Sequence, residues 1–210
     1  MILVSIIRRG KLLVVLLSAA GVLLVMALAP RPGSAESYFD EATEAYDNGD
    51  YQKSMELYDK VIEVNHTIAA AWQNRGSAKY KMGYFYGAIG DFEKAIQLSP
   101  ANYEAWNSCG MAYYKTQQHL DALTHSKKAL KINPEFAPAH NNLGLTKYRL
   151  GYRIKFLQSA INDFTKAIDI SPEKGAAYYN RAVVKFKIGD GEGARADITK
   201  FKELDERVNY

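Results

Sequence analysis

The chain has 210 residues, of which 48% are hydrophobic and 12% aromatic. This composition supports a folded core and excludes a largely disordered chain. The formal net charge of +4 comes from the N-terminal end, because four basic residues precede the first acid: Arg8, Arg9, Lys11 and Arg31. The segment from Ala35 onward contains the other 23 of the 27 basic residues and all 23 acidic ones, so it has no formal net charge. The neutral balance of this segment removes the electrostatic argument for a nucleic-acid binder.

The N-terminal segment resembles an export signal. A basic flank is followed by the uncharged run LLVVLLSAAGVLLVMALA at residues 12–29, which we expect to form a hydrophobic helix. Its eighteen residues lie between the core of a signal peptide and the roughly 20 residues of a spanning helix. Two outcomes therefore stay open: cleavage after Ala29 or Ala35, or retention as a single membrane anchor. In both outcomes the basic flank stays on the cytoplasmic side, and the remainder of the chain is exported to the periplasm or the extracellular space.

After a short linker at residues 30–34, a spacing of 34 residues organises the chain. Residues 69–102 place aromatic, small and proline residues at offsets that recur in residues 103–136. The recurring pairs are Trp72 and Trp106, Gly76 and Gly110, Tyr80 and Tyr114, Ala88 and Ala122, Ala95 and Ala129, and Pro100 and Pro134. A period of this length is typical of helix-turn-helix repeats. The pattern resembles the tetratricopeptide repeat (TPR) consensus.

This resemblance implies an all-α fold, a right-handed superhelix of about five helix-turn-helix pairs. The expected repeats are residues 35–68, 69–102, 103–136, 137–174 and 175–210. The fourth has four extra residues near Arg153–Leu157. They form either a tolerated loop bulge or about one more helical turn, which would make Ile154, Phe156 and Leu157 a contact ridge. The small residues at repeat spacing are expected to pack helices together, and the large aromatics to fill the gaps between pairs.

In TPR superhelices the first helix of each pair lines a concave groove, so the resemblance also implies candidate peptide-binding residues. The sixth position of the repeats gives Asp40, Asn74, Ser108, Asn142 and Asn180, of which the amides resemble an asparagine ladder that holds a peptide backbone. The twelfth position gives an aromatic column, Tyr46, Tyr80, Tyr114, Tyr148 and Phe186, and the thirteenth gives Asp47, Lys81, Lys115, Arg149 and Lys187. Such a surface suits a partner with apolar and acidic side chains. Alternatively, the aromatics are mostly buried and the cations only solvated.

Catalytic and metal motifs are not recognisable. The sequence has no phosphate-binding glycine loop and no nucleophile elbow. His66, His119, His125 and His140 are too scattered for a zinc site of defined spacing. The single cysteine, Cys109, aligns with Arg75 and Leu143 of neighbouring repeats, and we expect it to be a buried small hydrophobe.

We therefore expect no cofactor and no metal, and a non-catalytic scaffold or adaptor outside the cytoplasmic membrane that binds a peptide or protein in its concave groove. Two alternatives stay open: a self-assembling structural module of an envelope complex, and an accessory subunit of an enzyme. Membrane contact is expected only through residues 12–29, if they are retained.

Overall fold

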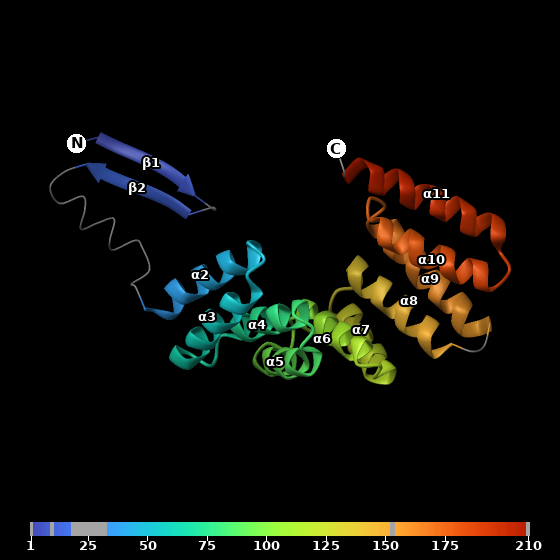
Figure 1. Cartoon of the computed structure of the whole chain (residues 1–210), viewed down its shortest axis with the longest axis horizontal. Helices are drawn as coiled ribbons and strands as arrows, with labels where there is room; N and C mark the ends of the chain where they lie inside the picture. Colours follow the sequence, from blue (N-terminus) through green and yellow to red (C-terminus); the bar gives the residue numbers. More distant parts are fainter. Residues whose placement is uncertain (1, 9–10, 18–32, 152–153, 209–210) are drawn as a thin grey trace.

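The computed structural model describes residues 2–8, 11–17, 33–151 and 154–208. Ten of the described elements are helices, which follow one another as five antiparallel pairs along an arc (Figure 1). The pairs are α2 (Ala35–Asp47) with α3 (Tyr51–Val64), α4 (Ala69–Lys81) with α5 (Phe85–Leu98), α6 (Tyr103–Lys115) with α7 (His119–Ile132), α8 (Ala137–Leu150) with α9 (Ile154–Ile170), and α10 (Gly175–Lys187) with α11 (Gly191–Val208). Each predicted repeat range contains one of these pairs, which we number repeats 1 to 5.

Left-handed residues make the turn within most pairs. Gly83 between α4 and α5 has φ +84°, and Gly189 between α10 and α11 has φ +91°. Glycine adopts this conformation without the steric cost of a Cβ atom, which makes it a common end of a helix. In repeat 3 the same place is taken by Gln117, at φ 64°.

Small residues let the two helices of a pair approach closely, as predicted. A Cβ atom on Gly76 would lie 2.9 Å from the ring of Phe92, and one on Gly144 only 2.7 Å from the ring of Phe164. The alanines predicted at the second small position, Ala88, Ala122 and Ala160, are fully buried. The predicted large residues also fix loops: the indole nitrogens of Trp72 and Trp106 donate to the carbonyls of His66 and Pro100, each at 2.9 Å.

The extra residues of repeat 4 lengthen its second helix. Helix α9 has 17 residues where α5 and α7 have 14 each, so the addition is close to one turn at its start. Leu157 is buried, whereas Ile154 is 76% exposed and Phe156 43% exposed. The helix-extension alternative thus describes residues 154–157, and Arg153 lies outside the described residues.

The N-terminal segment differs from the expected hydrophobic helix. Strands β1 (Ile2–Arg8) and β2 (Lys11–Leu17) pair antiparallel, in a register from Ile2 opposite Leu17 to Arg8 opposite Lys11. The run is rich in valine, isoleucine and leucine, and a short apolar run of this kind fits a strand or a helix equally well by periodicity. The expected helix is therefore wrong for residues 12–17, and its remainder, 18–29, lies outside the described residues. Among the described helices, none combines the length and apolar character that crossing a bilayer requires.

Candidate functional site

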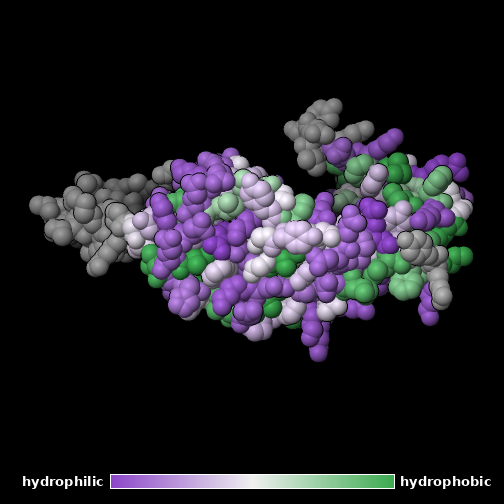
Figure 2. Space-filling view, turned by 60° about the horizontal axis from the view of Figure 1, so that its bottom comes forward, coloured by the Kyte–Doolittle hydropathy of each residue, from purple (hydrophilic) through white to green (hydrophobic). Residues whose placement is uncertain are grey.

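The first helices of the pairs line the inner side of the arc. Successive first helices contact one another, from α2 with α4 to α8 with α10, whereas no such contact joins successive second helices in the described chain. In Figure 1, α4 accordingly lies toward the inside of the arc and α5 toward the outside. The outer side, which Figure 2 brings forward, is mostly hydrophilic over its middle. The inner side is therefore the better candidate for a binding site.

Two adjoining cavities open on the inner side of repeats 1 to 3, and together we call them the N-terminal groove. One has a volume of about 280 Å³ and the other about 240 Å³, and both are lined by Tyr46 and Ser77. The larger is completed by Tyr80, Lys81, Phe92, Asn107, Ser108 and Met111, and the smaller by Thr43, Asp47, Tyr58 and Asn74. Both cavities thus present hydroxyl, amide and aromatic groups, and they meet at Tyr46 and Ser77.

A hydrogen-bonded tyrosine forms the floor of this groove. The hydroxyl of Tyr58 lies 2.9 Å from the Thr43 hydroxyl and accepts a 3.0 Å hydrogen bond from the Asn74 amide. Burial raises the pKa of Tyr58, so its phenol stays neutral at ordinary pH. The hydrogen bond to Tyr58 therefore fixes the orientation of the Asn74 amide in the groove.

The asparagines predicted as a ladder are engaged in a different way. The Asn142 amide is buried and donates to the side-chain oxygen of Asn107 at 2.7 Å. The Asn180 amide donates to Asn141 in the same manner, at 2.9 Å. Each bond joins the sixth position of one repeat to the fifth position of the repeat before it. These amides tie neighbouring first helices together, and this contact uses one N–H donor of each.

Two of the predicted cations contact aromatic rings of the preceding repeat. Arg149 donates to the Tyr114 hydroxyl at 2.9 Å and its guanidinium lies 5.9 Å from the ring centre, while Lys187 lies 5.0 Å above the ring of Tyr148. The hydrogen bond to Tyr114 is the main reason why the pKa of Arg149 is raised. A third cavity of about 370 Å³ surrounds this pair and is lined by Tyr114, Lys115, Gln117, His119 and Arg149. Lys81 and Lys115 themselves are exposed.

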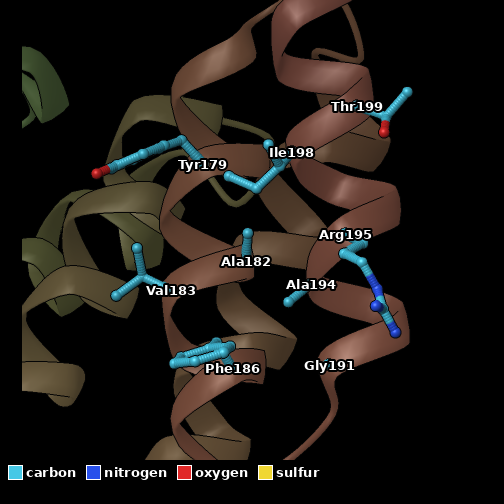
Figure 3. A pocket seen from close by; sticks show the side chains of 9 residues that line it. All are labelled: Tyr179, Ala182, Val183, Phe186, Gly191, Ala194, Arg195, Ile198 and Thr199. Carbon is cyan, nitrogen blue, oxygen red and sulfur yellow. The ribbon is translucent and has the colours of Figure 1, made fainter.

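The last repeat carries a separate apolar hollow, the C-terminal groove, with a volume of about 660 Å³. Its lining is Tyr179, Ala182, Val183 and Phe186 of α10 with Gly191, Ala194, Arg195, Ile198 and Thr199 of α11. Figure 3 shows Tyr179, Val183 and Phe186 on one side of α10, and Ala182, Ala194 and Ile198 between the two helices. Phe186, predicted to continue the aromatic column, is 76% exposed at this end.

Sequence reasoning missed several residues of the N-terminal groove. Ser77 and Met111 occupy the ninth position of their repeats and Asn107 the fifth, one or two helical turns before the twelfth-position tyrosines. Residues three and four apart share a helix face, so the face that carries Tyr80 also carries Ser77. That periodicity was the available signal.

Family models match three parts of the chain. Models described as tetratricopeptide repeat match residues 35–66 and 69–102, and a model described as TPR repeat matches residues 112–151, which together make up about half of the chain. With five helix pairs of the expected spacing, these matches place the protein in the tetratricopeptide repeat family. No curated protein matches the chain.

Solved structures share this fold. MamA from Desulfovibrio magneticus RS-1 (residues 41 to the end) has a TM-score of 0.71 at 21% identity, over 82% of this chain and 96% of that one. TTC0263 from Thermus thermophilus, described as a thermophilic TPR protein, has a TM-score of 0.69 at 19% identity, over 84% of this chain and 97% of that one. YrrB, described as a TPR protein with an unusual peptide-binding site, has a TM-score of 0.64 at 21% identity, over 83% of this chain and 88% of that one. At these identities the likeness shows the fold alone.

Proposed function

We propose that the protein is a non-catalytic interaction scaffold that binds an extended segment of a partner protein in the N-terminal groove. The observation that supports this most is the pair of adjoining cavities on the inner side of repeats 1 to 3, lined by both polar and aromatic groups. A peptide backbone needs donors and acceptors at regular intervals. The Ser108 hydroxyl offers both, the Asn107 amide nitrogen offers donors, and the Ser77 oxygen, whose hydroxyl donates to the Gln73 carbonyl, offers an acceptor. The peptide-binding site described for YrrB, which shares the fold, agrees with this use of it.

The lining also suggests the chemistry of the partner. Tyr46, Tyr80 and Met111 present apolar surface to a side chain that enters the larger cavity, and Lys81 is exposed at its edge. A segment with an apolar residue followed by an acidic one fits this arrangement, because the apolar residue anchors it and the acid pairs with Lys81. Lys115 and Arg149 extend the cationic side toward the third cavity.

Charge reversal in the groove tests this proposal. Peptides selected by display against the purified protein are measured for affinity to the wild type and to Lys81→Glu, which we expect to weaken binding at least about tenfold, or roughly 1.4 kcal/mol. Lys128→Glu is the matched control, because Lys128 is an exposed lysine on α7, the second helix of repeat 3, and lines none of the three inner cavities. Equal loss in both variants, or none in either, would show that the ligand lies elsewhere.

We also propose that the repeats act outside the cytoplasmic membrane. The support is the basic flank of Arg8, Arg9 and Lys11 before the apolar run of residues 12–29. Fractionation of cells that express the full chain, followed by intact mass measurement, tests this. A full-length protein in the cytosolic fraction would contradict export, and one that stays in the membrane pellet after carbonate washing would favour the anchor.

Self-association is a second candidate function, favoured by the C-terminal groove. In repeats 1 to 4 the groove of each pair receives the first helix of the next repeat, as α5 and α6 or α9 and α10 show. The open groove of repeat 5 would take the corresponding helix of a second copy, α2. Light scattering over a range of concentrations tests it: association that Phe186→Asp abolishes supports the idea, and a wild-type monomer at all concentrations rejects it.

A further inference from the structure

Three potential metal ligands converge at the junction of repeats 2 and 3. Glu93 comes from α5, Cys109 from α6 and His125 from α7, each 16 residues after the last. One ligand atom of each residue lies within 4.8 Å of those of the other two. No short sequence motif connects them, because the stacking of three different helices creates the cluster.

In repeats 2 and 5 the equivalent place is occupied by a cation, the guanidinium of an arginine. In repeat 2, Arg75 stands in the position of Cys109 and contacts Asp59 of the preceding repeat and Asp91 of its own, at 2.6 Å each. In repeat 5, Arg181 contacts Thr165 and Asp197 in the same geometry, at 3.0 and 2.6 Å. The guanidinium lies between two second helices in both cases. Cys109 lies between Glu93 and His125, which are the residues equivalent to Asp59 and Asp91.

Repeat 3 keeps a carboxylate at this junction but lacks both cations. The eleventh position holds Lys79 in repeat 2 and Lys185 in repeat 5, each paired with the local aspartate. In repeat 3 it holds Tyr113, whose hydroxyl donates to Glu93 at 2.5 Å. Within the described residues no lysine or arginine forms an ion pair with Glu93. A bound metal ion would supply the positive charge that the arginine supplies elsewhere.

Neighbouring groups already orient the imidazole and the carboxylate. Nδ1 of His125 lies 2.8 Å from the carbonyl oxygen of Asp121, and because a carbonyl only accepts, Nδ1 carries the proton and Nε2 the lone pair. The ring is held between Trp106 and Tyr113, at centroid distances of 5.2 and 4.9 Å. A histidine ligand whose other nitrogen donates to a carbonyl is the usual arrangement at metal sites, since it fixes the tautomer and the ring.

We propose that Glu93, Cys109 and His125 bind a zinc ion, with water in the fourth position. Thiolate, imidazole and carboxylate are the ligand types that zinc uses at three-residue sites. Tetrahedral bonds of about 2.0 to 2.3 Å require ligand atoms roughly 3.5 Å apart. Side chains that lie within 4.8 Å reach this by small rotations, without a change in the helices.

Binding at this site releases a proton. Burial, together with the charges of Glu93 and Asp121, raises the pKa of the Cys109 thiol, so it is protonated without metal. When the Zn–S bond forms, the thiol proton leaves to solvent and the sulfur binds as thiolate.

Cobalt substitution tests the proposal directly, because Co²⁺ reports its own ligands. Titration of the full-length protein with Co²⁺ should saturate at one equivalent, with a thiolate charge-transfer band in the near ultraviolet, and Zn²⁺ should displace it. Cys109→Ser should remove the band and weaken Zn²⁺ binding at least about tenfold, as should His125→Ala. His119→Ala is the control, because His119 is outside the cluster and should leave both measurements unchanged.

A second readout keeps the test clear of folding effects. Each variant is first checked for its helical circular dichroism, and Zn²⁺ should then raise the melting temperature of the wild type and of His119→Ala but not of Cys109→Ser. The proposal is overturned if the wild type shows no thiolate band, or if Cys109→Ser binds Zn²⁺ as tightly as the wild type. Neither outcome bears on peptide binding in the N-terminal groove, so the two proposals succeed or fail independently.

Discussion

Repeats 2 and 3 have the same length and the same helix lengths, but their junctions use different chemistry. Repeat 2 places Arg75 and Lys79 around the buried Asp91, whereas repeat 3 places Cys109 and Tyr113 around His125. Their packing differs too, since Phe92 fills the space next to Gly76 and the smaller Ser126 faces Gly110. The repeat spacing therefore fixes where side chains meet, while the stability and the chemistry of each junction are set separately.

Repeats 4 and 5 show two further junctions, one like that of repeat 2 and one intermediate. Repeat 5 has both cations, Arg181 and Lys185, around Asp197. Repeat 4 has Leu143 in place of the arginine, and only Lys147 pairs with Asp163, at 2.6 Å. The number of cations around the second-helix acid thus falls from two to one, and in repeat 3 there is neither cation nor acid at these positions.

Removal of the acid in repeat 2 should have the largest effect on stability. Asp91 is 3% exposed, accepts two hydrogen bonds from Arg75 and forms an ion pair with Lys79. Asp91→Ala leaves two partly buried cations without that partner, and we expect a loss of about 3 kcal/mol in the free energy of unfolding, measured in urea.

The other acid on the same arginine is the matched control. Asp59 is 51% exposed at its side chain, and its ion pair with Arg75 faces solvent. Asp59→Ala should cost at most about 1 kcal/mol, as exposed pairs do. Equal losses in the two variants would show that burial does not decide the strength of this junction.

The next largest difference between repeats 2 and 3 should come from glycine-to-alanine substitutions at the small position of the first helix. A Cβ atom on Gly76 would lie 2.9 Å from the ring of the buried Phe92, so Gly76→Ala should destabilise by about 2 kcal/mol through overpacking. Gly110→Ala meets Ser126 at 3.2 Å and should cost less. Gly90→Ala, with nothing within 4 Å, should stabilise by up to about 1 kcal/mol from helix propensity alone. The order of the three melting temperatures checks this, and an inverted order contradicts it.

Repeat 3 should gain stability from the loss of a buried hydroxyl. Ser126 is fully buried, and its oxygen has no hydrogen-bond partner in the described part of the chain. Ser126→Ala should raise the free energy of unfolding by about 1 kcal/mol, because an unsatisfied hydroxyl is removed. Ser159→Ala is the opposite case, since its hydroxyl accepts from Lys147 at 2.9 Å, and it should be neutral or destabilising. Destabilisation by Ser126→Ala would mean that this hydroxyl is satisfied in solution.

The sequence predicts the repeats well because small residues and prolines recur at fixed offsets. It predicts the site less well, because the site depends on contacts between repeats. Asn142 has the residue type of a ligand-binding amide, yet it pairs with Asn107, which lies 35 residues earlier. The same limit hides the cluster of Glu93, Cys109 and His125, whose members share no local motif. At the N-terminus the failure is different, since an apolar run has no period that separates a strand from a helix.

The smallest expected effect is a pH dependence of stability with opposite sign in repeats 5 and 4. It tests whether the number of cations around the second-helix acid sets the pKa of that acid. Burial alone would raise the pKa of Asp197, but hydrogen bonds from Arg181 and Lys185 more than offset it and hold the pKa below its ordinary value. At Asp163 burial dominates over the single Lys147, and the pKa is raised. Asp197 therefore adds stability above the unfolded pKa of about 3.9 that is lost as the pH falls below it, whereas Asp163 costs stability as the pH rises above it.

Asparagine at each position should reveal the two signs. In urea unfolding from about pH 3 to pH 6, Asp197→Asn should flatten the rise of stability with pH at the acid end, because the unfolded-state proton uptake of Asp197 is removed. Asp163→Asn should steepen the rise above about pH 4, because a group that binds its proton more tightly when folded is removed. Changes of the same sign would mean that the second cation of repeat 5, Arg181, does not set the difference between the two junctions.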